Sequence, residues 1–153
     1  RRSLLVDSRA DMITYGMGEK ILVAVAKLLD RGVPIRKIRD VRGTVFLIKK
    51  GERVHFPAVE TYDYDTLKTD KRAYADAYGI QYRNQDAIYG KAILEDYGDK
   101  VLVQNPPMPP LEREELDHVY ALPYMRTWHP MYAKDGGVPA IEEVRFSITH
   151  NRG

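Results

Sequence analysis

The chain has 153 residues, with 24 Lys and Arg, 22 Asp and Glu, and a formal net charge of +2. A hydrophobic share of 44% beside 30% charged residues is typical of a globular chain and excludes a disordered tail, and the small net charge alone does not indicate nucleic-acid binding. The absence of cysteine excludes disulfides, thiolate metal sites and a cysteine nucleophile within these residues, and no apolar run approaches the about 18 residues of a membrane span.

The first 32 residues predict a strand, a tight turn and a helix. The apolar run Met12–Tyr15 is followed by the turn Gly16-Met17-Gly18-Glu19. Apolar residues then recur at helical spacing up to Arg31-Gly32, at Ile21, Leu22, Val25, Leu28 and Leu29. A glycine turn between strand and helix can bind phosphate. However, the dinucleotide motif needs a third glycine where Ile21 stands, so a plain tight turn is the favoured interpretation.

Residues 33–60 predict a β-hairpin. Thr44–Ile48 is strand-prone, Lys49–Glu52 is a turn, Arg53–Phe56 is the expected return strand, and Pro57 ends the ladder. Eight basic residues lie between positions 31 and 53, at 31, 36, 37, 39, 42, 49, 50 and 53. They indicate either a solvated hairpin face, which is favoured, or an RNA-binding module that uses the basic hairpin at residues 31–53.

Residues 63–84 predict one long helix with a tyrosine stripe. Tyr74, Tyr78 and Tyr82 share this stripe with Leu67. Packing against the core is the favoured interpretation of these rings, and stacking on bases or on a ring cofactor is the alternative.

The second half of the chain predicts a hairpin, a linker, a short helix and a final strand. The hairpin joins residues 92–95 to residues 100–104, and the linker is the proline-rich stretch 105–110. A helix is expected over 112–120. Val144, Phe146 and Ile148 alternate with polar residues, which predicts a strand with one buried face.

Several blocks of this sequence resemble radical SAM proteins of the YgiQ family. They run in the same order from Val6-Asp7-Ser8-Arg9-Ala10-Asp11 through Gln104-Asn105-Pro106-Pro107 to Pro139–Gly153. The last block is similar to the region immediately before the motif Cys-x-x-x-Cys-x-x-Cys. The resemblance therefore implies that the cluster cysteines come after Gly153 and that this chain is an amino-side fragment, inactive alone.

The resemblance also implies a fold of class α/β. Residues 1–32 would end an open, mostly parallel Rossmann-like sheet of the cobalamin-binding type, and residues 33–104 would form a hairpin-plus-helix insert. Residues 105–142 would be a proline-rich linker with a short helix, and 143–153 the first strand of a partial (β/α) barrel. In this fold Gly16, Gly18 and Glu19 would lie at a cobalamin-like cofactor-binding turn.

The chemistry implied for the parent protein is the reductive cleavage of S-adenosylmethionine at a [4Fe-4S] cluster, with both cofactors bound outside this chain. No catalytic or metal-ligating residue is assigned here. The expected partners are the rest of the same chain and an unknown small-molecule or RNA substrate. No membrane partner is expected, and the expected location is the cytoplasm.

Overall fold

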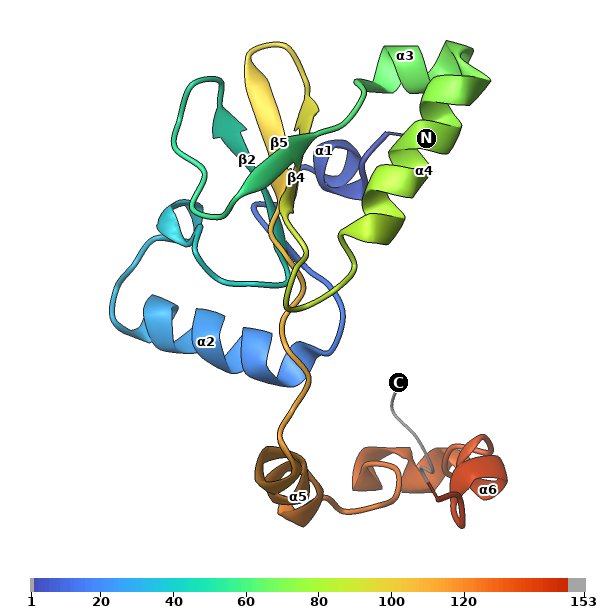
Figure 1. Cartoon of the computed structure of the whole chain (residues 1–153). Coiled ribbons are helices and arrows are strands. Elements are labelled where there is room, and N and C mark those ends of the chain that lie inside the picture. Colours follow the sequence, from blue (N-terminus) through green and yellow to red (C-terminus); the bar gives the residue numbers. More distant parts are fainter. Residues whose placement is uncertain (1, 149–153) are drawn as a thin grey trace. The chain divides into compact units, whose positions relative to one another are not determined.

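The computed structural model describes residues 2–148, and the chain divides into two compact units, Arg1–Leu111 and Glu112–Gly153 (Figure 1). The first unit contains, in chain order, α1 (Leu4–Ser8), β1 (Ile13–Thr14), α2 (Gly18–Asp30), the 3-10 turn η1 (Ile35–Lys37), β2 (Thr44–Lys49), β3 (Ala58–Glu60), α3 (Tyr64–Thr69), α4 (Lys71–Arg83), β4 (Ala92–Asp96) and β5 (Lys100–Gln104). The second contains α5 (Arg113–Ala121), η2 (Pro130–Asp135) and α6 (Ile141–Val144). The predicted α/β class is confirmed.

The five strands of the first unit form one mixed sheet in the order β1-β2-β5-β4-β3. Only β3 and β4 run parallel, and the other neighbouring pairs are antiparallel. The expectation of a mostly parallel sheet is therefore wrong for these residues. Because β1 pairs with β2, the segment before residue 33 belongs to the same sheet as the segment that follows it.

The predicted strand at 44–48 is confirmed as β2, but its predicted partner is wrong. Residues 53–56 form no strand, and β2 pairs instead with β1 on one side and with β5 on the other, with Val45 opposite Gln104. Both edges of β2 are thus occupied by more distant segments. Pro57 does not end a ladder, because β3 starts at the next residue and the Pro57 carbonyl accepts from Ala92 N at 2.8 Å.

The second predicted hairpin is confirmed as β4 and β5. The strands pair antiparallel, and the turn between them places Gly98 at φ +81°. The Asp96 carboxylate accepts from Gly98 N at 2.6 Å, which closes the turn.

Two hydrophobic clusters hold the first unit together. The first lies on one face of the sheet, where Phe46, Ile48, Ala92 and Val103 are buried beneath Val54 and Phe56 of the loop after β2. The second lies between α2 and the chain after it, where Ile21 packs with Ile38 and Val41. The predicted stripe of α2 is therefore buried at its first residue, Ile21, and partly at Val25 and Leu28, whereas Leu22 and Leu29 are exposed.

The single helix predicted over 63–84 is two helices, and the chain turns sharply between α3 and α4 (Figure 1). Asp70 ends the first helix and caps the second, because its side chain accepts from Arg72 N at 2.8 Å and from Ala73 N at 3.2 Å.

The tyrosine stripe was predicted to pack against the core, and this prediction is wrong for its three tyrosines. Tyr74, Tyr78 and Tyr82 are 64–66% exposed, and α4 buries Ala73 and Ala77 instead. Alanine lets the helix backbone approach its neighbours, so the small residues take the inner face. Tyr78 and Tyr82 stack on each other with ring centroids 6.4 Å apart.

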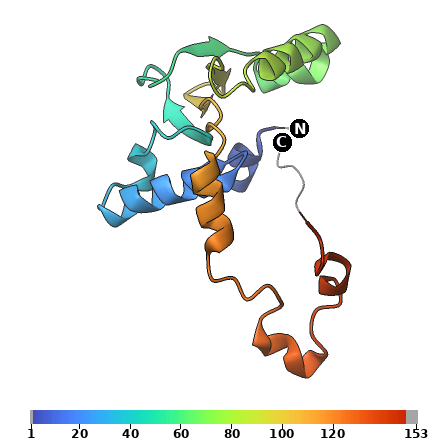
Figure 2. The same ribbon diagram turned by 60° about the horizontal axis from the view of Figure 1, so that its bottom comes forward.

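In the second unit α5 confirms the predicted short helix, but the predicted final strand is absent from the described residues. Figure 2 shows α5, in orange, and the chain that follows it. Residues Ile141–Val144 form a helical turn, and Phe146 and Ile148 are 89% and 90% exposed. A strand needs a neighbour for its backbone groups, and no described segment pairs with this one. The rest of the predicted strand, Thr149–Gly153, lies outside the described residues.

The longest helices that the structure describes have 13 residues, and none of them could cross a membrane.

Candidate functional site

The predicted cofactor-binding residues lie together at the junction of β1 and α2. Gly16 has φ +78°, Gly18 is the first residue of α2, and Glu19 lies in the first turn of that helix. A Cβ on Gly16 would have no heavy atom within 4 Å, so the backbone angle explains the glycine without a ligand. The tight turn is present, and a cobalamin-like role for these three residues stays a prediction.

The predicted basic cluster makes many contacts within its own chain. Arg36 Nε lies 2.9 Å from the Asp11 carboxylate, and Lys50 Nζ lies 2.5 Å from that of Asp96. Arg39 binds Glu52, and its guanidinium holds the pKa of Glu52 below the usual range.

Arg42 lies under the loops at the end of the sheet. It donates to Ala87 O at 2.8 Å and to Pro107 O at 3.1 Å, and its guanidinium lies over the Phe56 ring. Four of the eight basic residues therefore have partners within their own chain. RNA binding by the remaining residues stays a prediction.

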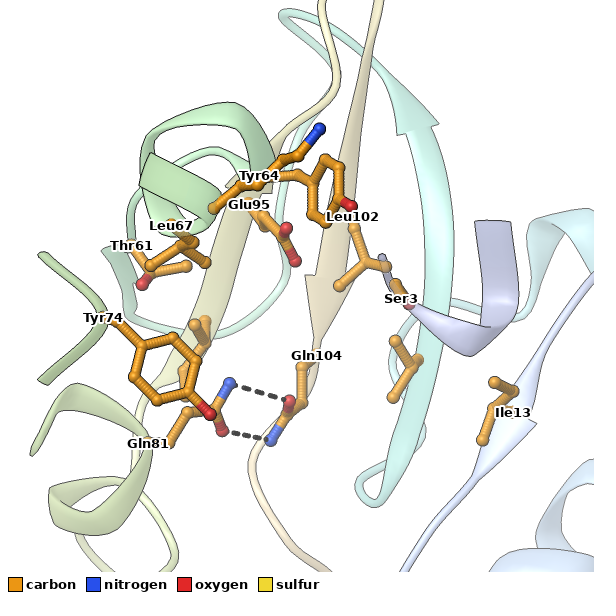
Figure 3. A pocket seen from close by; sticks show the side chains of 13 residues that line it. Ser3, Ile13, Thr61, Tyr64, Leu67, Tyr74, Gln81, Glu95, Leu102 and Gln104 are labelled. Atoms are coloured by element: carbon orange, nitrogen blue, oxygen red, sulfur yellow. Dashed lines mark hydrogen bonds between the residues drawn. The ribbon is translucent and has the colours of Figure 1, made fainter. Parts of the chain in front are cut away.

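A cavity of about 510 Å³ lies on the face of the sheet opposite the first hydrophobic cluster. Side chains alternate along a strand, so Ile93 and Glu95 of β4 and Leu102 and Gln104 of β5 point to this face. Figure 3 shows Glu95, Leu102 and Gln104 among the side chains that line the cavity. Val45 and Ile13 extend the floor toward β1.

The segment from β3 through α4 forms one wall of the cavity. Its residues there are Thr61, Tyr64, Leu67, Lys68, Tyr74 and Gln81. Ser3, which precedes α1, lies on the opposite side (Figure 3). The cavity therefore combines aliphatic, phenolic, amide and charged groups from distant parts of the chain.

The amides of Gln81 and Gln104 bind each other reciprocally at 3.4 and 3.2 Å, as the dashed lines in Figure 3 show. This pair joins α4 to β5 and fixes the lower end of the cavity.

Glu95 is the half-buried carboxylate of the cavity. Burial is the main cause that raises its pKa above the ordinary value, and the nearby charge of Asp63 acts in the same direction. The Tyr97 hydroxyl donates to Glu95 Oε1 at 2.9 Å and accepts from Ser3 N at 3.2 Å. Burial also raises the pKa of Tyr97 to about 12, so the phenol keeps its proton at neutral pH.

Of the residues that line this cavity, the sequence had singled out only Leu67 and Tyr74, as members of the tyrosine stripe, and not Glu95. One signal was present, since the predicted strand 92–95 places Glu95 on the same face as Ile93. A carboxylate on an apolar face indicates either a solvated face or a site, and the sequence alone does not show which helix covers it.

The chain has no residues that fit an iron–sulfur cluster. Such clusters are held by cysteine thiolates, and the 153 residues contain no cysteine. Among the described residues, no group of three or more His, Asp or Glu is arranged to hold a metal ion.

Comparison with known proteins gives matches over the whole chain. It is 50% identical over 153 residues to a UPF0313 protein of Clostridium botulinum (strain ATCC 19397 / Type A), covering all of this chain and 24% of that protein. It is 44% identical over 153 residues to a UPF0313 protein of Clostridium perfringens (strain ATCC 13124), covering all of this chain and 23% of that protein. The chain thus spans about a quarter of the length of these relatives.

No solved structure matches the chain. The family model described as Radical SAM N-terminal matches residues 1–147, which include all of the first unit and most of the second. On that match, the chain belongs to the Radical SAM N-terminal family.

Proposed function

We propose that the protein to which this region belongs is a radical SAM enzyme, related to the YgiQ group, that cleaves S-adenosylmethionine reductively. The observation that carries this proposal is the family match over residues 1–147. When bound, a [4Fe-4S] cluster supplies the electron for that cleavage.

This region does not ligate the cluster in the proposed enzyme, because it lacks thiolates. Its contribution is a folded α/β unit that adjoins the part of the protein bearing the cysteines. The cavity between α4 and the sheet is a place where this unit can bind a small molecule.

The test compares the 153-residue chain alone with a long protein, which contains this region together with the part that bears the cysteines. Both are reconstituted with iron and sulfide without oxygen, and 5′-deoxyadenosine released from S-adenosylmethionine is measured after adding dithionite. We expect about four iron atoms per long protein and release of 5′-deoxyadenosine, and neither from the chain alone. A long protein that holds no iron after reconstitution, or that holds a cluster and releases no 5′-deoxyadenosine, would overturn the proposal.

A further inference from the structure

We propose that the cavity between α3, α4 and the sheet binds a small aliphatic amine, whose ammonium group pairs with the carboxylate of Glu95. This site is separate from the proposed cleavage of S-adenosylmethionine and requires neither the cluster nor its cysteines.

The Glu95 carboxylate has one oxygen that is engaged and one that is available. Oε1 accepts from Tyr97, whereas Oε2 has no hydrogen bond to any described residue, and no ion pair joins Glu95 to a described cation. In Figure 3 the carboxylate points into the space between the helices and β5. A half-buried carboxylate without a positive partner is stabilised by a cation that enters beside it.

The contacts of Tyr97 determine what Glu95 can bind. Ser3 N donates to the phenol oxygen, so the phenol proton is directed to Glu95. The carboxylate therefore already has its neutral donor, and its second oxygen is an acceptor for a donor from the ligand. An ammonium group offers three such donors together with the missing charge.

The charges around Glu95 favour a cation. Asp63 adds negative charge from the start of α3, and Tyr64 and Tyr74 contribute phenol groups to the wall. Lys68 is the cation among the lining residues, and its side chain is exposed and makes no ion pair with Glu95. Arg2, near the same end of α3, binds Asp7 at 2.8 Å.

The rest of the cavity suits a short apolar body. Leu67, Ile93 and Leu102 contribute aliphatic surface next to Glu95, and a volume of about 510 Å³ lies within the range of small-molecule sites. Beyond them the amides of Gln81 and Gln104 are occupied with each other, so the far end of the cavity offers few free polar groups. A ligand with one ammonium and an aliphatic chain fits this distribution.

The test titrates the 153-residue chain with n-pentylamine and follows amide shifts by NMR. Pentan-1-ol and pentanoate serve as matched ligands of the same length without the positive charge. We expect saturable binding of the amine, with the shifts centred on Glu95 and Leu102, and binding at least about tenfold weaker for the alcohol and for pentanoate.

Two variants locate the charge that is responsible. Glu95→Gln keeps an acceptor for Tyr97 and removes the charge, so the amine should bind about tenfold more weakly. Glu60→Gln removes the same charge from the exposed edge strand β3, which lines a different cavity, and should leave the affinity unchanged. Urea unfolding of both variants checks that they fold.

The affinity should also fall as the pH is lowered through the pKa of Glu95, which lies above the ordinary glutamate value. Equal binding of amine and alcohol, an unchanged affinity in Glu95→Gln, or no saturable binding by the folded chain would each overturn the proposal. None of these measurements uses the cluster, so the proposed function and this site can fail independently.

Discussion

Gly43 joins three segments that are far apart in the sequence. Its carbonyl accepts from Tyr15 N at 2.9 Å, and its N–H donates to Pro106 O at 2.8 Å. Its φ is +72°, and a Cβ would lie 2.4 Å from Ile21 Cδ1 and 3.2 Å from Tyr15 O. The position therefore requires glycine both for its backbone angle and for the space that α2 occupies.

Gly43→Ala should destabilise the first unit by about 3 kcal/mol, because it adds overpacking to the cost of the left-handed backbone. Gly51→Ala is the matched control, since Gly51 has φ +87° but no atom near its Cβ position, and it should cost only about 1–2 kcal/mol. Urea unfolding of both variants measures the difference. If both variants lose the same free energy of unfolding, α2 moves to make room for the added methyl group and overpacking contributes nothing.

Asn105 is a buried polar side chain, 1% exposed, at the end of β5. Its Nδ2 group donates toward Val41 O at 2.9 Å, Arg39 O at 3.1 Å and Thr44 Oγ1 at 3.1 Å. These contacts tie the chain before β2 to the chain after β5, and they require a donor at this position.

Asn105→Asp should therefore cost about 3 kcal/mol at pH 7, more than Asn105→Ala, because it sets a charged acceptor against the two carbonyl oxygens. Burial raises the pKa of the new carboxyl in the folded state above its unfolded value. Stability lost at neutral pH should therefore return as the pH falls and the group becomes a donor. Urea unfolding at pH 7 and pH 5 measures this. If the difference in free energy of unfolding between Asn105→Asp and the natural chain is the same at both pH values, the prediction is wrong.

At the scale of elements, local patterns predicted the strands and helices better than their partners. The run 44–48 has strand character whatever it pairs with, whereas its neighbours β1 and β5 are chosen by packing across the whole unit. The local sequence of residues 53–56 is compatible with a strand, so it did not show that this prediction was wrong. In the structure Val54 and Phe56 instead cover the first hydrophobic cluster.

The candidate site also shows that local patterns predict single elements but not the distant segments that they contact. Alternation in the strand placed Glu95 beside Ile93, but the Ser3–Tyr97–Glu95 chain of hydrogen bonds joins residues 94 positions apart. The final predicted strand was wrong in its described part for a related reason, because alternation at 144–148 gives strand character but no neighbour.

The break between α3 and α4 gives a prediction for one element. Asp70→Ala removes the acceptor for two free amides of α4 and should destabilise the first unit by about 1 kcal/mol. Asp70→Asn is the matched control and should be nearly neutral, because Asn caps a helix as well as Asp does. Thermal unfolding followed by circular dichroism compares the two. A loss in Asp70→Asn equal to that in Asp70→Ala would assign the effect to charge and not to the cap.

At the scale of the whole molecule, the two units differ in burial. All strands that the structure describes and both hydrophobic clusters lie within Arg1–Leu111, whereas no described residue from 112 to 148 is buried. The first unit thus holds the interactions that make folding cooperative.

A chain of residues 1–111 should consequently unfold in one cooperative transition, with a free energy of unfolding within about 1 kcal/mol of that of the full chain. Urea titrations of the two chains, followed by far-UV circular dichroism, provide the comparison. The matched control ends at residue 99 and lacks β5, the strand between β2 and β4, so it should not fold. A shortened chain 1–111 without a cooperative transition would show that the second unit is needed for folding.

Because β2 pairs with β5, β2 has to wait for this partner while the chain is synthesised on the ribosome. Gln104, the last residue of β5, comes 55 positions after Lys49, the last residue of β2. At about 5–20 residues per second it is added roughly 3–11 s later. During that interval the apolar run Val45–Ile48 has only the two residues of β1 to pair with, and it can associate with other nascent chains. We therefore expect the risk of wrong association at β2 to be greatest in the unfinished chain, before β5 can pair with it.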